Sequence, residues 1–188
     1  MTNRLCLCLL LLPGLALVAC SPALAARDAA PASNSAVPTA IAPTPLPQYP
    51  PDDCPITQPP DPPFTPPEPH PVVAPYGEFW YGSDTLWALL QPDGRWYALP
   101  RDEKGYGQKV LWFREGYDMT TEQKPQVTVS GRRLDGDETF EQSGATNGHN
   151  PDVGMFMLTG VTVPAAGCWE ITGHYHKSSL SFVVWVAP

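Results

Sequence analysis

The chain has 188 residues and a formal net charge of −8, from 11 Lys and Arg against 19 Asp and Glu. This length predicts one domain with flanking segments rather than two domains. Arg132 and Arg133 are the only adjacent basic residues. The acidic charge argues against a nucleic-acid partner, because phosphate binding relies on clustered Lys and Arg.

The N-terminus has the pattern of a secretory signal peptide. Arg4 precedes an apolar run over residues 5–12, and a Pro13-Gly14 break and several small residues follow it. The run is too short for a membrane-spanning helix. We therefore assign residues 1–19 to a signal peptide that is removed on export.

The four residues Leu17-Val18-Ala19-Cys20 resemble a bacterial lipobox, the recognition sequence of the lipoprotein signal peptidase. The resemblance implies that Cys20 becomes the first residue of a lipoprotein and carries a diacylglyceryl group, with a further acyl chain such as palmitate on its amino group. The partner of these chains would be a lipid bilayer, since each buried methylene contributes about 0.8 kcal/mol. The alternative is cleavage after Ala25, which would release a soluble secreted protein.

The residue after the lipobox cysteine bears on localisation. Ser21 follows Cys20, and a residue other than Asp at this place resembles the default sorting signal of Gram-negative lipoproteins toward the outer membrane. We expect the chain to be anchored in the bacterial cell envelope, outside the cytoplasm, and in the outer membrane if the cell is Gram-negative.

Proline divides the remaining chain into two parts. Of 25 prolines, eighteen lie between Pro22 and Pro75, and all six tryptophans come after them. The first part has too little apolar surface to offset the entropy cost of ordering, and its prolines favour an extended backbone. We expect residues 20–75 to be a disordered, flexible tether in which His70 is exposed, and residues 76–188 to be the packed domain.

Cysteine counting predicts one disulfide. Cys6 and Cys8 leave with the signal peptide and Cys20 takes the lipid, so Cys54 and Cys168 remain as a pair in an oxidising compartment. A disulfide between them would attach the end of the tether to the domain. The alternative is two free thiols.

Residues 76–188 contain short apolar runs separated by turn residues, which predicts an all-β domain. The expected strands cover residues 77–82, 85–90, 95–99, 109–114, 126–131, 154–163, 168–175 and 180–186. Between the second and third of them, Gln91-Pro92-Asp93-Gly94 has the residues of a tight turn and predicts a hairpin. Short strands without a helical period favour an antiparallel sandwich or barrel.

The last two expected strands resemble those that close an immunoglobulin-like sandwich. In this resemblance, Gly167 and Trp169 stand at the corner that usually holds a tyrosine, so the tyrosine hydroxyl bond to the backbone is missing. More broadly, the segments WYGSDTLWALLQPDG, GRRLDG, GCWEITG and SLSFVVWV are similar to exported bacterial lipoproteins of no assigned activity, with a C-terminal immunoglobulin-like domain. The resemblance implies fold and export, and it provides no catalytic residues.

Three histidines and a glutamate are weak metal-binding candidates. Glu170, His174 and His176 alternate along one strand and would share a face, and His149 could approach from a loop. Imidazole groups suit zinc or copper. His-x-His beside a turn is also common on solvated faces, so we expect no metal and no other cofactor.

Three tryptophans, Trp80, Trp87 and Trp96, are weak candidates for a binding surface. Neighbours such as Trp96 and Tyr97 point to opposite faces of a strand, so one of each aromatic pair should lie outside the core unless a loop covers it. Exposed rings could stack on sugars or on a partner protein. The simpler interpretation is that these large rings fill a small core.

The sequence contains no nucleophile elbow and no phosphate-binding glycine loop, so we do not expect an enzyme. The expected function is that of a membrane-anchored, extracytoplasmic lipoprotein that binds an envelope protein or polysaccharide, or supports an envelope assembly. The alternative is a metal-binding accessory protein or a hydrolase that uses Glu170, His174 and His176.

Overall fold

The computed structural model describes residues 45–188, which lie in one compact unit. The expected signal peptide and Cys20 lie outside the described residues. The first sheet has the order β1-β2-β5-β9-β8, with β4 paired to β5 off this path. Its strands are β1 (Phe79–Ser83), β2 (Leu86–Leu90), β4 (Arg101–Asp102), β5 (Gly105–Phe113), β8 (Thr146–Asn150) and β9 (Gly154–Val163).

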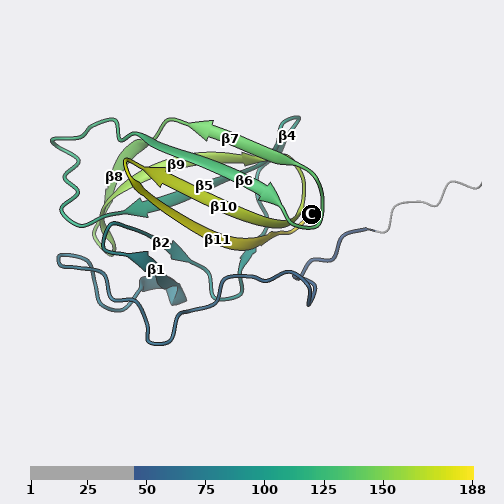
Figure 1. Cartoon of the computed structure of the whole chain (residues 1–188), viewed down its shortest axis with the longest axis horizontal. Coiled ribbons are helices and arrows are strands. Elements are labelled where there is room, and N and C mark those ends of the chain that lie inside the picture. Colours follow the sequence, from purple (N-terminus) through teal and green to yellow (C-terminus); the bar gives the residue numbers. More distant parts are fainter. Residues whose placement is uncertain (1–44) are drawn as a thin grey trace, which may run out of the picture. The chain divides into compact units, whose positions relative to one another are not determined.

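The second sheet has the order β3-β11-β10-β6-β7 and packs face to face with the first (Figure 1). Its strands are β3 (Arg95–Trp96), β6 (Val127–Arg133), β7 (Thr139–Ser143), β10 (Gly167–Tyr175) and β11 (Ser178–Val186). All strand pairs are antiparallel except β3 with β11. The expected all-β antiparallel sandwich is confirmed.

The strand order agrees with the immunoglobulin resemblance. The orders β2-β5-β9-β8 and β11-β10-β6-β7 match the A-B-E-D and G-F-C-C′ sheets of immunoglobulin domains. At the corner before β10, the indole nitrogen of Trp169 donates a hydrogen bond to the carbonyl oxygen of Ala165 at 3.0 Å. Trp169 therefore makes a side-chain bond to the upstream backbone, as the usual tyrosine does through its hydroxyl group.

The core between the sheets follows the alternation of the last hairpin. Trp169, Ile171 and Tyr175 of β10 are at most 2% exposed, and Phe182 of β11 is 1% exposed. Trp112 of β5 packs so closely on Gly173 that a side chain there would collide with its ring. These contacts join the two sheets at their centres.

The expected hairpin at Gln91-Pro92-Asp93-Gly94 is wrong, although the turn itself forms. The amide of Gly94 donates to the carbonyl of Gln91 at 3.0 Å, but β2 belongs to the first sheet and β3 to the second. After the turn, the chain crosses the sandwich because Trp96 is buried in the core and β3 pairs in parallel with β11. The apolar runs predict two strands, but not the sheets that they join.

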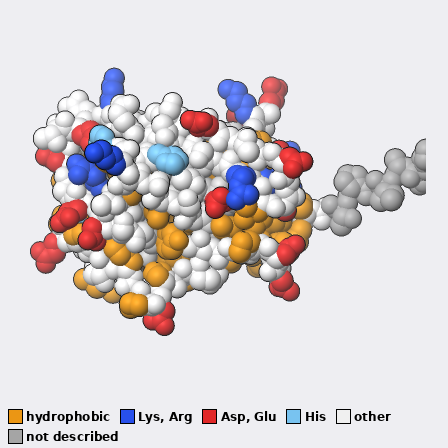
Figure 2. All heavy atoms as spheres, in the orientation of Figure 1, with side chains coloured by type: hydrophobic (Ala, Val, Ile, Leu, Met, Phe, Trp, Pro, Cys, Tyr) orange, Lys and Arg blue, Asp and Glu red, His pale blue; other side chains and the backbone are white. Residues whose placement is uncertain are grey.

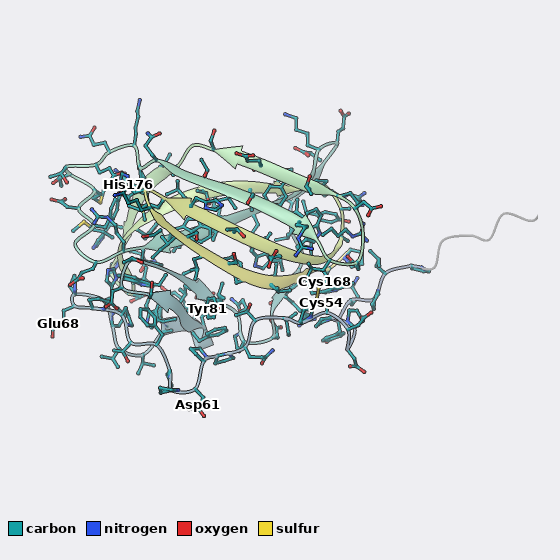
Figure 3. The ribbon with its side chains drawn as sticks, in the orientation of Figure 1. Cys54, Asp61, Glu68, Tyr81, Cys168 and His176 are labelled. Carbon is teal, nitrogen blue, oxygen red and sulfur yellow. A yellow bond between two sulfur atoms is a disulfide. The ribbon has the colours of Figure 1, made fainter. Side chains whose placement is uncertain are left out.

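Residues 45–74, named here the arm, differ from the expected flexible tether. Figure 1 shows the arm running along the sandwich. Cys54 and Cys168 form the predicted disulfide, which is drawn in Figure 3. Next to it, the amide of Thr57 donates to the carbonyl of Val183 at 3.0 Å, and the amide of Val183 donates to the Thr57 hydroxyl at 2.8 Å. The first half of the arm is therefore attached to the outer face and edge of the second sheet.

The second half of the arm covers the outer face of the first sheet. Phe64 packs against a buried cluster that contains Trp80, Trp87 and Phe113. His70 is only 9% exposed, and its Nδ1 lies 2.8 Å from the carbonyl oxygen of Val153. The expectation of an exposed His70 is wrong. Proline removes backbone donors but leaves side chains free to pack, so a proline-rich composition does not by itself exclude an ordered segment.

A single turn of 3-10 helix, Pro75–Gly77, connects the arm to β1. Among residues 45–188, no helix is long and apolar enough to cross a membrane. Figure 2 shows apolar side chains, including Pro and Tyr, gathered on the side of the surface along which the arm runs.

Candidate functional site

The three tryptophan candidates do not form an exposed surface. Trp80, Trp87 and Trp96 are 3%, 0% and 7% exposed. Trp96 points into the main core, and the arm covers Trp80 and Trp87. The alternative expectation, that a loop or the core buries these rings, agrees with the structure, so the three tryptophans do not form an exposed row.

The metal candidates are also not brought together. No group of three or more His, Cys, Asp or Glu side chains in the described part of the chain could hold a metal ion. Glu170 pairs with Arg132 at 3.0 Å, and His149 lies on β8 in the other sheet. His176 occupies the turn after β10, at the opposite end of that strand from Cys168 (Figure 3).

A hollow lined by both apolar and polar side chains lies where β2 and β5 separate. The two strands pair only at Trp87 with Phe113 and at Ala88 with Trp112. Beyond these pairs a cleft of about 530 Å³ opens between residues 89–91 and 108–111. This volume lies within the range of about 300–1,000 Å³ that is usual for small-molecule sites.

The cleft is lined from both sheets and from the loop before β1. Its apolar residues include Leu89, Leu90, Trp96, Leu99, Val110, Leu111, Val153 and Phe182. Its polar and aromatic residues are Tyr76, Glu78, Gln91, Arg95, Tyr97, Gln108, Lys109 and Asn150. An apolar floor with a few polar groups is the usual composition of a ligand site.

Two exposed tyrosine rings lie along this cleft. Tyr76 and Tyr97 are 64% and 57% exposed, although both are large aromatic side chains. The Tyr76 hydroxyl donates a hydrogen bond to the Asp152 carboxylate, which raises the pKa of the tyrosine. The guanidinium of Arg95 lies 5.1 Å from the centre of the Tyr97 ring. Both rings thus have neighbours that restrict their orientation.

Arg95 is itself held by two other contacts. Its Nε donates to the Asp93 carboxylate at 2.9 Å, and its guanidinium lies 4.2 Å from the centre of the Tyr49 ring in the arm. Most of the charge of Arg95 is therefore already compensated. This arrangement favours a structural role for Arg95 at the cleft over the binding of an anion.

A carboxyl and an amide form a pair at the edge of the cleft. The Gln91 side-chain nitrogen donates to the Glu78 carboxylate at 2.6 Å. Burial raises the pKa of the Glu78 carboxyl, and the bond from Gln91 opposes this effect. The pair leaves the Gln91 oxygen and the remaining carboxylate lone pairs as acceptors for hydroxyl groups of a ligand.

Strained backbone occurs at both sides of the cleft. Three residues other than glycine have a positive φ in the described part of the chain, and two of them are Tyr76 at 60° and Ala98 at 51°. Ala98 lies between Tyr97 and Leu99, which both line the cleft. Such conformations cost about 1–3 kcal/mol each and concentrate at functional sites.

A second hollow competes with the cleft. It lies between the arm prolines Pro60, Pro62 and Pro63, Tyr81 of β1 and Leu180 of β11. This groove carries no charged residue, and its polar side chains are the three hydroxyl groups of Thr65, Tyr81 and Ser83, so it has few groups that could orient a ligand. We therefore take the cleft between β2 and β5 as the candidate site.

Two residues of this site had a signal in the sequence: Trp96, a binding candidate that lines the cleft, and its neighbour Tyr97. Alternation predicts that one of Trp96 and Tyr97 lies outside the core, and Tyr97 does. Tyr76 precedes the first strand, where no alternation applies. The cleft itself depends on where β2 leaves β5, which residue patterns do not reveal. No family model, no curated protein and no solved structure matches this chain.

Proposed function

We propose that this chain is an exported lipoprotein that acts as a non-enzymatic binding module on the extracytoplasmic side of a bacterial membrane, with the cleft between β2 and β5 as its ligand site. The observation that carries the proposal is the pair of restricted, exposed tyrosine rings beside an apolar hollow with polar groups at its edge. Exposed aromatic groups of this kind mark sites of interaction.

The lining of the cleft favours binding over catalysis. Glu78 is the only carboxylate among the lining residues, and none of them is Ser, Cys or His. Glycoside hydrolysis usually needs two carboxyl groups, and acyl transfer usually needs a nucleophile with a base. The cleft offers stacking surfaces and hydrogen bonds, which are sufficient for recognition.

The anchor is proposed from the sequence. The apolar leader and the Leu17-Val18-Ala19-Cys20 motif support lipidation of Cys20, and residues 21–44 would separate the compact unit from the bilayer. A binding module in this position would retain its ligand close to the membrane. Lipidation gives the module a fixed location, since several acyl chains together anchor firmly.

The binding test uses the chain from residue 21 to residue 188, which contains the whole compact unit. The protein is mixed with isolated bacterial cell envelopes, and the fraction that sediments with them is measured. We expect the wild-type chain to sediment and the double variant Tyr97→Ala with Gln108→Ala to remain in solution. Val73→Ala, at an 80% exposed residue outside the cleft, is the control and should sediment like the wild type. Equal sedimentation of the double variant would refute the cleft as the site.

The anchor is tested separately. Cells that express the full chain are grown with labelled palmitate, and the label on the wild-type protein is compared with that on Cys20→Ser. We expect label only on the wild-type protein, together with an intact mass that corresponds to a lipidated chain beginning at Cys20. An unlabelled protein that begins at Ala26 would contradict the anchor and leave the binding proposal to its own test.

A further inference from the structure

We infer that the cleft between β2 and β5 binds a neutral oligosaccharide, with Tyr76 and Tyr97 as stacking surfaces and Gln91 and Gln108 as hydrogen-bonding groups. This inference rests on the proposed function and specifies its ligand class. Its evidence is the combination of ring exposure, amide groups and compensated charge at one hollow.

The aromatic groups match the faces of sugar rings. A pyranose ring presents C–H groups on its faces and hydroxyl groups around its edge, so it packs on an aromatic face while its edge remains hydrogen-bonded. Tyr76 and Tyr97 are the two large apolar side chains along the cleft that are more than half exposed. Their hydroxyl groups also keep the rings compatible with water when no ligand is bound.

The polar groups match the edges of sugar rings. A sugar hydroxyl both donates and accepts a hydrogen bond, and a side-chain amide offers both functions at a fixed spacing. Gln91, Gln108 and Asn150 supply three amides at the cleft, and Glu78 adds an acceptor already oriented by its bond to Gln91. This set suits a polyol better than an apolar ligand, which would leave the amides unpaired.

The charges of the cleft favour a neutral sugar over an acidic one. Arg95 is bound to Asp93, and Lys109 is exposed and is the only other basic residue in the lining, which also contains the Glu78 carboxyl. The net charge of the whole chain is −8, which repels polyanions at long range. An acidic polysaccharide would therefore find neither a free cationic cluster nor a favourable field.

A peptide added as a strand is the competing occupant. Strand addition requires an open sheet edge, and the separated part of β2 consists only of Leu89 and Leu90, which face residues 108–111 of β5 across the cleft. Strands in globular proteins usually have five to six residues, so this edge is short for peptide binding. The short edge therefore favours a saccharide over a peptide strand at this cleft.

The test measures binding of four neutral hexasaccharides, namely cellohexaose, chitohexaose, mannohexaose and maltohexaose, to residues 21–188 by isothermal titration calorimetry. We expect at least one to bind, and we expect Tyr97→Ala to weaken that binding about tenfold, which corresponds to about 1.4 kcal/mol, because the variant loses one of the two stacking surfaces. Tyr97→Phe should retain the affinity, and Gln108→Leu should reduce it several-fold. Thermal unfolding of each variant checks that the fold is unchanged.

The outcomes separate this inference from the proposed function. If none of the four sugars binds, or if Tyr97→Ala binds as well as the wild type, the saccharide inference is wrong. If envelopes still retain the protein in a cleft-dependent way, but protease treatment of the envelopes abolishes retention, the ligand is a protein and only the saccharide inference fails. If retention does not depend on the cleft, both fail.

Discussion

The ring of His70 packs edge-on against Trp87, with their centres 5.2 Å apart and their planes at 85°. His70 belongs to a proline-rich segment, and Trp87 belongs to β2 in the first sheet. The same imidazole also packs edge-on against Phe113 at 5.4 Å and against Trp80 at 6.4 Å. The arm thus completes an aromatic cluster that would otherwise face water, and the folded unit includes the arm.

This relationship predicts that His70→Ala destabilises the protein. The change removes the edge-on ring contacts and the bond to the carbonyl of Val153, so we expect a loss of about 1–3 kcal/mol in the free energy of unfolding. Urea denaturation measures the loss. Val73→Ala, in the same arm but 80% exposed, should change stability by less than about 0.5 kcal/mol. Equal effects of the two substitutions would show that the arm is not part of the cooperative unit.

The disulfide provides a second test of the arm. Cys54 and Cys168 are separated by 114 residues, and both sulfur-bearing side chains are buried beside Trp185. Replacing both cysteines by serine should lower the free energy of unfolding by about 2–5 kcal/mol. A reductant should lower the stability of the wild-type protein toward that of the double variant and leave the double variant unchanged. An unchanged wild-type protein under full reduction would contradict this prediction.

Trp169 and Trp87 form a matched pair for testing the corner hydrogen bond. Both side chains are fully buried, but the Trp169 indole donates to Ala165, whereas the Trp87 indole nitrogen has no acceptor among residues 45–188. Trp169→Phe should therefore lower the free energy of unfolding by about 0.5–1.5 kcal/mol more than Trp87→Phe does, because only Trp169→Phe removes a hydrogen bond. Chemical denaturation of the two variants gives this difference, and a larger loss for Trp87→Phe would oppose it.

The raised pKa of Glu78, at the candidate site, predicts that the stability of the protein depends on pH. Because burial raises its pKa above the ordinary 4.5, the folded state holds a proton more tightly than the unfolded state. The stabilising contribution of Glu78 is thus fully present below pH 4.5 and is lost as the pH rises through its folded pKa. Glu78→Gln cannot titrate, so its stability relative to the wild type should be higher at pH 7 than at pH 4. Denaturation at the two pH values measures this, and the opposite order would contradict it.

The sequence was most informative where alternation decides burial. Trp169, Ile171 and Tyr175 lie in the core, because they alternate along β10 with the face predicted for Glu170 and His174. The pairing of Cys54 with Cys168 followed from counting. The polar strands β7 and β8 were not predicted, because Thr139–Ser143 and Thr146–Asn150 lack an apolar face of their own. They are strands because neighbouring strands provide hydrogen-bonding partners.

Two features of the candidate site could not be predicted from the sequence, and each has a physical reason. The proline-rich composition predicts a flexible arm, but two single residues, Phe64 and His70, attach it to the sandwich. Their rings help to bury Trp80 and Trp87. The cleft arises because β2 stops pairing with β5 after Ala88, where the chain turns to cross to the second sheet. The sequence does not reveal where this crossing begins. The exposure of Tyr76 and Tyr97 indicates a binding site only when the cleft beside them is known.

An amide NMR titration tests most directly whether the cleft between β2 and β5 binds an envelope ligand. The isotope-labelled chain, residues 21–188, is titrated with soluble fragments released from isolated bacterial cell envelopes. We expect the shifted signals to concentrate at residues 89–91 and 108–111 and at Tyr97, around the cleft. Shifts concentrated at the groove beside Tyr81 and Leu180, or a spectrum that does not change, would contradict the assignment of the cleft as the ligand site.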